Sequence, residues 1–278
     1  MTSARRCACL AVMSRNFAET GMKVDWSKQV VLITGASSGI GRALAVELAR
    51  RGASLGLLAR RAEELLKTAK AVEEAGGRAL VLTTDVRDAR GVEAAARRVR
   101  EQWGRIDLLV ANSGVGVITP ASTLRADEVA DVISINAIGV ANSVAAVLPD
   151  MLARRSGHLV AISSLAAYRG MPKSAAYSAS KAAVTTFFES LRVDLRGTGV
   201  AVTVIHPGFI KTPMTAGRKG RLLFVLELDD ATRRIVRALE RRPRTFAFPW
   251  QLASLVRLLK LMPDAVYDRI GSSTSFRE

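Results

Sequence analysis

The sequence contains very few cysteine and histidine residues. Among its 278 residues are two cysteines, Cys7 and Cys9, and two histidines, His158 and His206. This content excludes a disulfide framework, and two ligands alone do not form a zinc site, so we expect no metal. Scarce cysteine also fits a reducing compartment, which predicts a cytoplasmic location.

Long apolar runs, acidic residues and aromatic residues are also scarce. No run of about 18 apolar residues occurs, which argues against a membrane-spanning helix. The chain has 25 acidic and 41 basic residues, a formal net charge of +16. Such a surplus is typical of proteins that meet nucleic acid, anionic lipid or an anionic cofactor. Aromatic residues make up 5% of the chain and no nucleic-acid-binding motif is present, so we expect no nucleic-acid partner.

The chain is rich in short apolar segments that alternate with helical patterns. Apolar residues make up 49% of the sequence, enough for one α/β domain with a full core. Buried strands are predicted at 29–34, 53–59, 79–84, 106–111, 158–164 and 200–205, with a last short strand at 244–248. Helices are predicted at 42–51, 62–75, 90–103, 126–154 with an interruption near Pro149, from 174 onward, and at 229–242.

A glycine-rich turn follows the first predicted strand. It reads Gly35-Ala36-Ser37-Ser38-Gly39-Ile40-Gly41 and leads into a predicted helix. Glycine lets the backbone approach a phosphate closely, and the free N–H groups of a helix N-terminus bind anions. This turn therefore predicts a dinucleotide site. A triphosphate-binding loop is excluded because Ile40 stands where that loop needs glycine.

The same turn also matches the Gly-x-Ser-x-Gly pattern of serine hydrolases, with Ser37 as the nucleophile. That hypothesis needs a late histidine, and His206 is the candidate. We disfavour it because His206 directly follows a strand and because Gly41 and the position on the first strand favour dinucleotide binding.

Arginine follows the second predicted strand. Enzymes that prefer NAD usually place an acidic residue about 20 positions after the glycines, to bind the ribose hydroxyls. Here that position holds Arg60, followed by Arg61. A guanidinium attracts the 2′-phosphate that a carboxylate would repel, so we predict NADP(H) in preference to NAD(H). Arg42 or the hydroxyls of Ser37 and Ser38 are further candidates, and a solvated arginine pair is the alternative.

Three more segments carry candidate residues for the cofactor and for catalysis. Asp85 ends the third strand, where it can meet an adenine amino group, and the turn 112–114 follows the fourth strand. Tyr177 and Lys181 are four residues apart, which places them on one face of a predicted helix. An ammonium group near a phenol lowers the phenol pKa, so this pair can transfer protons at neutral pH.

Together these motifs resemble the short-chain dehydrogenase/reductase family over roughly residues 28–242. The matching pieces are Thr34-Gly35-x-x-x-Gly39-Ile40-Gly41, Asp85, Asn112-x-Gly114, Asn136, Ser164, Tyr177-x-x-x-Lys181 and Pro207-Gly208. The resemblance implies a doubly wound Rossmann fold of the α/β class, with a mostly parallel six- to seven-stranded sheet and helices on both faces. One departure is Ala111-Asn112-Ser113-Gly114, where the family often has Asn-Asn-Ala-Gly.

The resemblance also implies roles for individual residues. The catalytic set would be Asn136, Ser164, Tyr177 and Lys181, with Tyr177 as the acid or base and Ser164 and Tyr177 contacting the substrate. Residues that would bind the cofactor are Gly35, Ser37, Ser38, Gly39, Ile40, Gly41, Arg60, Asp85, Val86, Asn112, Gly114, Tyr177, Lys181, Pro207, Gly208, Ile210 and Thr212. Lys181 would hold the nicotinamide ribose, and Asn136 would support a proton relay through its backbone and a water molecule. A homodimer or homotetramer is expected.

The predicted domain organisation has three parts. Residues 1–27 form an extension that we expect to be disordered, although it also resembles a short signal or transit segment or precedes a later start codon. Residues 28–248 form the dinucleotide-binding catalytic domain, with a lid over the substrate near 209–228. Residues 249–278 form an apolar helical tail.

The predicted helix 250–262 has a polar residue at every third position and a broad apolar face. Such a helix fits peripheral contact with a membrane, a partner subunit or the rim of the pocket. The pocket candidates are mostly apolar, and they are Val115, Val117, Ile118, Leu165, Tyr168, Met171, Phe209 and Met214. This composition predicts a hydrophobic carbonyl substrate or its alcohol.

The sequence thus predicts an oxidoreductase that reduces a hydrophobic carbonyl compound with NADPH, or oxidises the alcohol. A 3-oxoacyl-thioester reductase is the nearest alternative activity. A non-catalytic dinucleotide-binding regulatory protein is the alternative from another class, and the complete Ser164, Tyr177 and Lys181 set argues against it.

Overall fold

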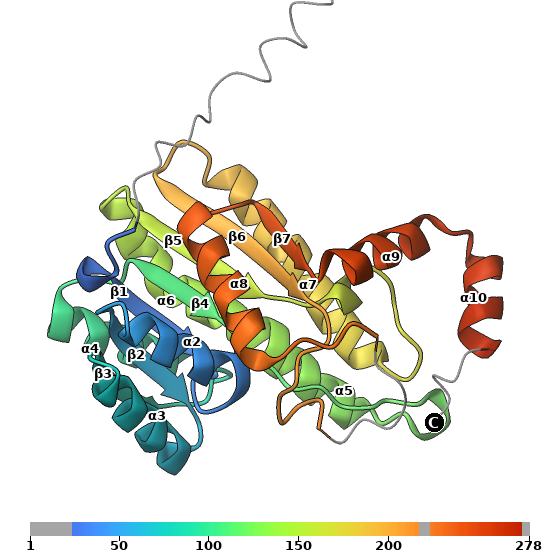
Figure 1. Cartoon of the computed structure of the whole chain (residues 1–278), viewed down its shortest axis with the longest axis horizontal. Coiled ribbons are helices and arrows are strands. Elements are labelled where there is room, and N and C mark those ends of the chain that lie inside the picture. The colour runs from blue at the N-terminus through green and yellow to red at the C-terminus, as the bar shows by residue number, and fades with distance from the viewer. Residues whose placement is uncertain (1–23, 217–222, 274–278) are drawn as a thin grey trace, which may run out of the picture.

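A seven-stranded parallel sheet forms the centre of the molecule. The computed structural model describes residues 24–216 and 223–273 (Figure 1). The strand order is β3-β2-β1-β4-β5-β6-β7. The strands are β1 (Val30–Thr34), β2 (Ser54–Ala59), β3 (Arg78–Thr83), β4 (Leu108–Ala111), β5 (Gly157–Ile162), β6 (Val200–Pro207) and β7 (Thr245–Phe248). The predicted Rossmann fold is therefore confirmed.

Helices and short turns connect these strands. The α-helices are α2 (Gly39–Ala49), α3 (Ala62–Glu74), α4 (Ala89–Trp103), α5 (Ala126–Ile133), α6 (Gly139–Ala153), α7 (Ala175–Asp194), α8 (Leu228–Arg241), α9 (Trp250–Leu261) and α10 (Asp264–Ser273). Shorter helical turns lie at Trp26–Lys28, Ala121–Thr123, Ser134–Ile138 and Leu165–Ala167. The predicted helix at 42–51 thus begins three residues earlier than expected, within the glycine-rich turn.

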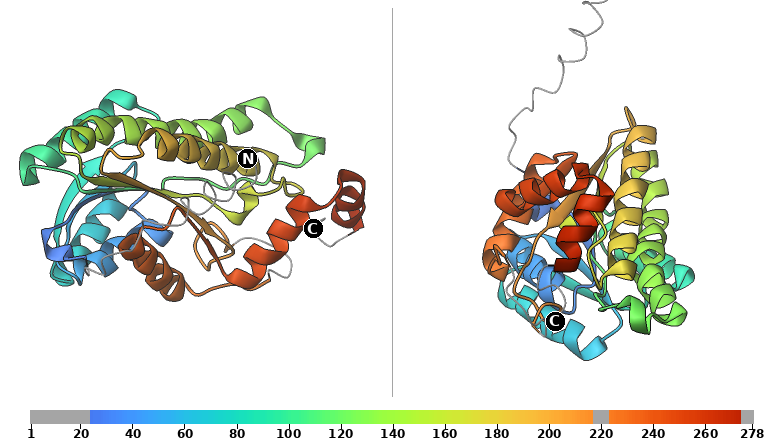
Figure 2. Two further views of the ribbon diagram at one scale, coloured as in Figure 1. Left: turned by 90° about the horizontal axis from the view of Figure 1, so that it is seen from above. Right: turned by 90° about the vertical axis from the view of Figure 1, so that its right-hand side faces the viewer.

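Helices cover both faces of the sheet, as the two views of Figure 2 show. One apolar core packs α2, α3 and α8 against the sheet, through residues such as Leu44, Leu65 and Ile235. A second core packs α4, α6 and α7 against the opposite face, through residues such as Val99 and Val147. Both faces of the strands are apolar because both are covered, as in other all-parallel sheets.

The strand order reverses between β1 and β4. From β1 the chain proceeds outward through β2 and β3, and then returns to β4 on the other side of β1. In doubly wound sheets such a reversal opens a crevice at the carboxyl ends of the strands. The residues after β1, β4, β5 and β6 therefore surround one region.

The helix predicted for 126–154 is interrupted, but not where proline suggested. Pro149 lies inside α6. The irregular part is a π-helical turn at Ser134–Ile138, which joins α5 to α6. The sequence carries no Pro or Gly signal within this turn, so the predicted position of the interruption was wrong.

The combined helix Ala126–Ala153 is long and apolar enough to cross a membrane by length and composition. Half of its most apolar window is buried inside the protein. Valine side chains of α6 belong to the second core. Burial of this kind is also typical of a core helix in a globular domain.

The segment after β6 and the C-terminal helices lie at the carboxyl side of the sheet. An isolated parallel bridge joins Ile210 to Leu226, which brings the two ends of the predicted lid region together. Residues 217–222 of this predicted lid, residues 1–23 of the predicted extension and residues 274–278 of the tail lie outside the described residues. Helix α9 lies beside β7 and α7 at one end of the molecule, and α10 stands beyond it (Figure 1).

Candidate active site

The glycine-rich turn is held by close backbone packing. Gly35 and Gly39 have φ values of +67° and +53°, in the left-handed region that favours glycine. A Cβ atom at Gly41 would lie 2.4 Å from the carbonyl oxygen of Gly35, so only glycine fits there. Gly41 thus allows α2 to pack closely against the preceding turn. The first turn of α2 faces the space at the carboxyl end of β1.

Arg61, which was not among the predicted site residues, contacts this turn directly. Its Nη2 donates to Ser37 Oγ at 2.9 Å and to Ser38 Oγ at 2.7 Å. Arg42 points elsewhere, since its Nη1 lies 4.0 Å from a carboxylate oxygen of Glu64. The two adjacent arginines were visible in the sequence, but no sequence signal showed which of them turns back to the serines.

Arg60 and Asp85 lie close to each other at the ends of β2 and β3. Arg60 Nη1 is 3.7 Å from Asp85 Oδ2. Arg87 donates to the same carboxylate, with Nη2 at 2.8 Å from Oδ2, and this contact is the main cause of the lowered pKa of Asp85. Asp85 does not line the neighbouring cavity, whereas Val86 does.

A cavity of about 410 Å³ lies between these elements, and we call it the polar cavity because hydroxyl and guanidinium groups are part of its lining. It is lined by the turn after β1, both arginines and the segments after β3 and β4, including Gly35, Ser37, Ser38, Gly39, Ile40, Arg60, Arg61, Val86, Asn112, Gly114 and Val115. Hydroxyl and guanidinium groups beside a helix N-terminus suit an anionic, phosphate-containing group. The residues present therefore fit a nicotinamide dinucleotide.

Asn112 links β4 to the glycine-rich turn. Its Nδ2 donates to the carbonyl oxygens of Thr34 at 3.0 Å and Gly35 at 3.3 Å. The backbone N–H groups of Asn112 and Ser113 both donate to Thr34 Oγ1 at 3.1 Å. These bonds fix the turn after β4 against the glycine-rich turn after β1. The Ser113 side chain is buried between them.

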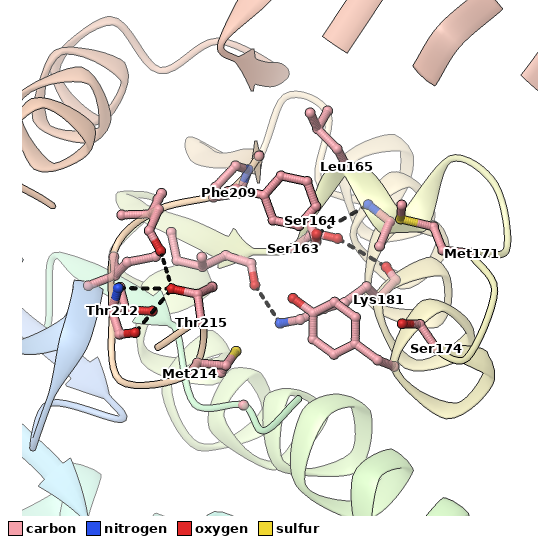
Figure 3. A pocket seen from close by; sticks show the side chains of 18 of the residues that line it. Ser163, Ser164, Leu165, Met171, Ser174, Lys181, Phe209, Thr212, Met214 and Thr215 are labelled. Carbon is pink, nitrogen blue, oxygen red and sulfur yellow. Dashed lines mark hydrogen bonds between the residues drawn. The ribbon is translucent and has the colours of Figure 1, made fainter. Parts of the chain in front are cut away.

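A second cavity, of about 140 Å³ and mainly apolar, adjoins the first. Five residues line both cavities: Ile40, Asn112, Gly114, Thr212 and Met214. The second cavity also brings together Ser164, Tyr177 and Lys181, as the sequence predicted, along with Pro207, Gly208 and Ile210. Figure 3 shows that its side chains come from the loop after β5, from α7 and from the loop after β6.

Lys181 is a buried cation at the floor of this cavity. Its Nζ donates to the carbonyl oxygen of Ile162 at 2.8 Å and lies 5.9 Å from the centroid of the Tyr177 ring. Burial lowers the pKa of Lys181 to about 8. The side chain is therefore still largely protonated at neutral pH, and its charge lies beside the phenol.

Asn136 lies in the π-helical turn and is fully buried. Its Oδ1 accepts from the Val115 N–H at 2.8 Å, and its Nδ2 donates to the Val115 carbonyl at 2.9 Å and to Ser180 Oγ at 3.0 Å. The side chain does not line either cavity, but a Cβ at Gly114 would lie 3.2 Å from Oδ1 and 3.4 Å from Lys181 Nζ. Asn136 thus holds the segment after β4 close to Lys181.

The two serines after β5 have different environments. Ser163 is buried, and its Oγ donates to the carbonyl oxygen of Lys181 at 3.0 Å. Ser164 Oγ accepts from the Ala166 N–H at 3.1 Å. The side chain of Ser163 is therefore engaged by α7, whereas the Ser164 hydroxyl retains its proton for donation.

His206 supports the backbone beside Ser164. Its Nδ1 lies 3.1 Å from the Ser164 carbonyl oxygen, and burial lowers its pKa to about 4. The ring is then neutral at pH 7, and Nδ1 carries the proton because a carbonyl only accepts. His206 contacts this backbone while Ser37 contacts Arg61, so the pair required by the serine hydrolase hypothesis has no support.

The apolar candidates for the pocket divide into two groups. Leu165, Met171, Phe209 and Met214 line the second cavity, whereas Val115 lines the first. Val117 and Ile118 are 37% and 55% exposed and line neither, and Tyr168 packs behind Leu165. The sequence did not single out Leu252 and Val256 of α9, two further apolar side chains of the wall. Their helical spacing was visible, but such spacing does not identify the surface against which a helix packs.

Comparison with protein-family models identifies the short chain dehydrogenase family over residues 29–221. An uncharacterised oxidoreductase of Myxococcus xanthus is 43% identical over 244 residues, which is 88% of this chain and 96% of the relative.

Two similar solved structures cover most of the chain. One is a short-chain dehydrogenase/reductase from Burkholderia phymatum in complex with NAD, with a TM-score of 0.78 and 28% identity over 84% of this chain and 94% of that one. The other is levodione reductase, with a TM-score of 0.74 and 29% identity over 82% of this chain and 98% of that one.

Proposed function

The chain belongs to the short-chain dehydrogenase/reductase family of oxidoreductases, and from this premise we propose that it reduces a hydrophobic carbonyl compound with NADPH, or oxidises the corresponding alcohol. One observation carries the proposal. An apolar cavity containing Ser164, Tyr177 and Lys181 shares five lining residues with a polar cavity at the glycine-rich turn. A dinucleotide in the polar cavity would therefore reach the three polar side chains.

The proposed mechanism divides the work among these residues. When bound, the nicotinamide would supply or accept the hydride. Ser164 donates a hydrogen bond to the carbonyl oxygen, and Tyr177 gives that oxygen its proton during reduction, or removes it during oxidation. Lys181 stabilises the phenolate of Tyr177 because its ammonium is close and buried, where charge interactions are stronger than in water.

Asn136 and Gly114 have supporting roles in this proposal. Asn136 fixes the Val115 backbone through two hydrogen bonds, which keeps the adjacent Gly114 close to Lys181. A side chain at position 114 would reduce the space beside the ammonium. The proposed proton relay from Lys181 to solvent would pass this point, through the backbone of Asn136 and a water molecule.

The preference for NADPH over NADH rests on the two arginines. Arg61 is anchored on Ser37 and Ser38, and Arg60 lies at the same edge of the polar cavity. An exposed guanidinium pair attracts a 2′-phosphate. The Burkholderia phymatum relative holds NAD, so the preference is a proposal for this chain. Asp85 remains the predicted adenine contact, although Arg87 engages its carboxylate in this structure.

The test is a panel of aldehydes, ketones and 3-oxoacyl thioesters, each assayed with NADPH and with NADH. The proposal requires oxidation of NADPH by at least one hydrophobic aldehyde or ketone, with a lower KM for NADPH than for NADH. Turnover of thioesters alone would favour the 3-oxoacyl-thioester alternative. Binding of NADPH without turnover of any carbonyl would contradict the proposed activity.

We also propose contact of α9 with an anionic membrane surface. Trp250, Leu258 and Leu261 are 70%, 62% and 83% exposed, and the basic residues Arg257 and Lys260 lie on the same helix. The net charge of +16 attracts anionic headgroups. Together these features resemble an interfacial amphipathic helix, which would give a cytoplasmic enzyme a peripheral membrane location.

A homodimer or homotetramer is proposed as the assembly. Phe187 and Val193 of α7 are 36% and 67% exposed, and they are available to pack against a second copy of the chain. Light scattering coupled to size-exclusion chromatography measures the assembly directly. A monomeric mass at micromolar concentration would contradict this proposal.

A further inference from the structure

Helix α9 forms one wall of the substrate cavity. Leu252 and Val256 line the cavity and are buried against Leu165, which follows β5. A Cβ atom at Gly208 would lie 2.9 Å from Leu252 Cδ2 and 3.0 Å from Pro249 Cδ. The start of α9 is therefore packed tightly on the backbone beside the catalytic residues.

Arg169 holds the far end of α9. Its Nη1 donates to the carbonyl oxygens of Lys260 at 3.3 Å and Met262 at 3.1 Å, and its Nη2 forms an ion pair with Asp264 Oδ1 at 2.7 Å. Carbonyls at the end of a helix lack intrahelical partners, so a cation is well placed there. The Arg169 side chain is only 17% exposed, whereas the Asp264 side chain is 91% exposed. The guanidinium is therefore held mainly by its burial against the protein and by the carbonyl oxygens, and the ion pair is open to water.

A second contact attaches α10 to the same loop. The Arg169 guanidinium lies 4.2 Å from the centroid of the Tyr267 ring, and the Tyr267 hydroxyl donates to the Gly170 carbonyl at 2.5 Å. We call Arg169, Asp264 and Tyr267 the clasp. The clasp joins the C-terminal helices to the loop that also supplies Leu165 and Met171 to the cavity wall.

The cavity behind this wall is small. Its volume is about 140 Å³, and its lining includes cofactor-side residues such as Ile40 and Asn112. An apolar cavity of about 150 Å³ in another protein accommodates one benzene molecule. The cavity also opens to solvent, so the comparison concerns groups that point toward α9. Such a group, when it is much larger than a single ring, collides with Leu252 or Val256 while α9 keeps this position.

We propose that Leu252 and Val256 set the upper size limit of the carbonyl substrate, and that Arg169 is the positioning residue that keeps them in place. This inference rests on the proposed oxidoreductase function and adds its substrate range: small carbonyl compounds with a compact apolar group. The wall lies beyond residue 221, where the match to the family model ends. The size limit is therefore set by helices outside the part of the chain that matches the family model.

The first experiment compares kcat/KM for 2-naphthaldehyde and for propanal. In Leu252→Ala, we expect the ratio of the two values to rise about tenfold, in the range that pocket methylene groups contribute to selectivity. The matched control is Leu258→Ala, the same change on the same helix at a side chain that is 62% exposed. A ratio unchanged in Leu252→Ala, or raised equally in the control, would overturn the size limit.

The second experiment addresses Arg169. We expect Arg169→Ala to raise the same ratio about threefold while kcat for propanal is retained, because a loosened α9 yields to a bulky group. Arg169→Lys should restore part of the selectivity, since it keeps the charge for Asp264. Backbone amides of α9 should exchange hydrogen faster in Arg169→Ala than in Arg237→Ala, an exposed arginine of α8. Faster exchange without any change of the ratio would refute the positioning role.

A binding measurement separates this inference from the proposed activity. Benzamide and 2-naphthamide carry the carbonyl but are not reduced, and their affinities can be measured by calorimetry in the presence of NADP⁺. We expect Leu252→Ala to bind 2-naphthamide at least about tenfold more tightly than the unmodified protein does. If no carbonyl is turned over, the proposed activity fails while this affinity difference still supports the size limit. Equal affinities, or no binding to either protein, would overturn the size limit.

Discussion

The two adjoining cavities are built in different ways. The polar cavity is formed mainly by turns that directly follow β1, β2, β3 and β4, with Thr212 and Met214 added from the loop after β6. Its shape depends on backbone contacts such as the packing of Gly41 against Gly35. The apolar cavity is closed by side chains from several separate segments, including the loop after β5, α7, the loop after β6, and α9. One cavity is therefore part of the sheet edge, whereas the other depends on how separate segments pack.

The two cavities also differ in how they relate to the match with the family model. The match to the family model covers residues 29–221, which includes every element around the polar cavity. Leu252 and Val256, which close the apolar cavity, lie outside it. We infer that cofactor chemistry is the general part of the molecule and substrate choice the particular part, and the following changes test that division.

The largest effect is expected where the two cavities meet. In Tyr177→Phe, kcat should fall about thousandfold, because a positioned acid or base contributes on that order. The dissociation constant of NADPH should stay within about threefold, since the ring is retained. Tyr168→Phe is the matched control and should keep near-normal turnover. Substantial carbonyl reduction by Tyr177→Phe would assign the proton transfer to another group.

The buried charge of Lys181 should be visible in the pH dependence of stability. Its pKa is about 8 in the folded protein, whereas an unperturbed lysine side chain has a pKa of 10.5. Between these values the unfolded chain binds more protons, so this residue makes stability rise with pH. Relative to Lys181→Met, the free energy of unfolding should gain about 2 kcal/mol between pH 7 and pH 9.5.

Denaturant unfolding of both proteins at several pH values measures this difference. A difference independent of pH would mean that Lys181 has an ordinary pKa. The activity should change in the opposite sense: kcat/KM should fall above about pH 8 as the ammonium that stabilises the Tyr177 phenolate loses its proton.

Removal of Arg61 should affect cofactor binding in the polar cavity only. In Arg61→Ala, we expect the dissociation constant of NADPH to rise about tenfold, a typical effect for a hydrogen bond to a charged group. The constant for NADH should not change, because NADH has no 2′-phosphate. Arg50→Ala, an exposed arginine at the end of α2, is the control. Equal losses for both cofactors would place Arg61 away from the 2′-phosphate.

The smallest effect concerns the outer face of α9. In Leu261→Ala, binding to vesicles that contain anionic lipid should weaken about threefold, because binding scales with the buried apolar area. Leu66→Ala removes a side chain that is also exposed, on α3, and should leave binding unchanged. If the unmodified protein does not bind these vesicles at low salt, the exposed face of α9 contacts a partner other than a membrane.

Residues of local sequence motifs come together in both cavities. Gly35, Gly39 and Asn112 lie where their spacing placed them, because turns that follow parallel strands meet at one edge of the sheet. Ser164, Tyr177 and Lys181 also share one cavity, as predicted. These residues belong to local motifs whose geometry the fold determines.

Other features depend on tertiary packing and have no local signal. The choice of Arg61 over Arg60 as the partner of Ser37 depends on side-chain directions after β2. The burial of Asn136 follows from a helix distortion that contains no proline or glycine within Ser134–Ile138. The sequence predicted three possible contacts for α9, which were a membrane, a partner subunit and the rim of the pocket. It could not distinguish them because each requires the same amphipathic pattern.

The π-helical turn at Ser134–Ile138 also determines how far the residues of α6 are rotated about the helix axis relative to those of α5. An extra residue in a helix rotates everything after it by about 100° relative to an uninterrupted α-helix. Contacts of α5 are mainly with α7, whereas α6 packs on α4. The continuous helix can thus contact two neighbours on different sides, and the turn that produces the offset contains Asn136, which lies beside the proposed proton path. Shortening this turn by one residue would therefore disturb the packing of both neighbours at once.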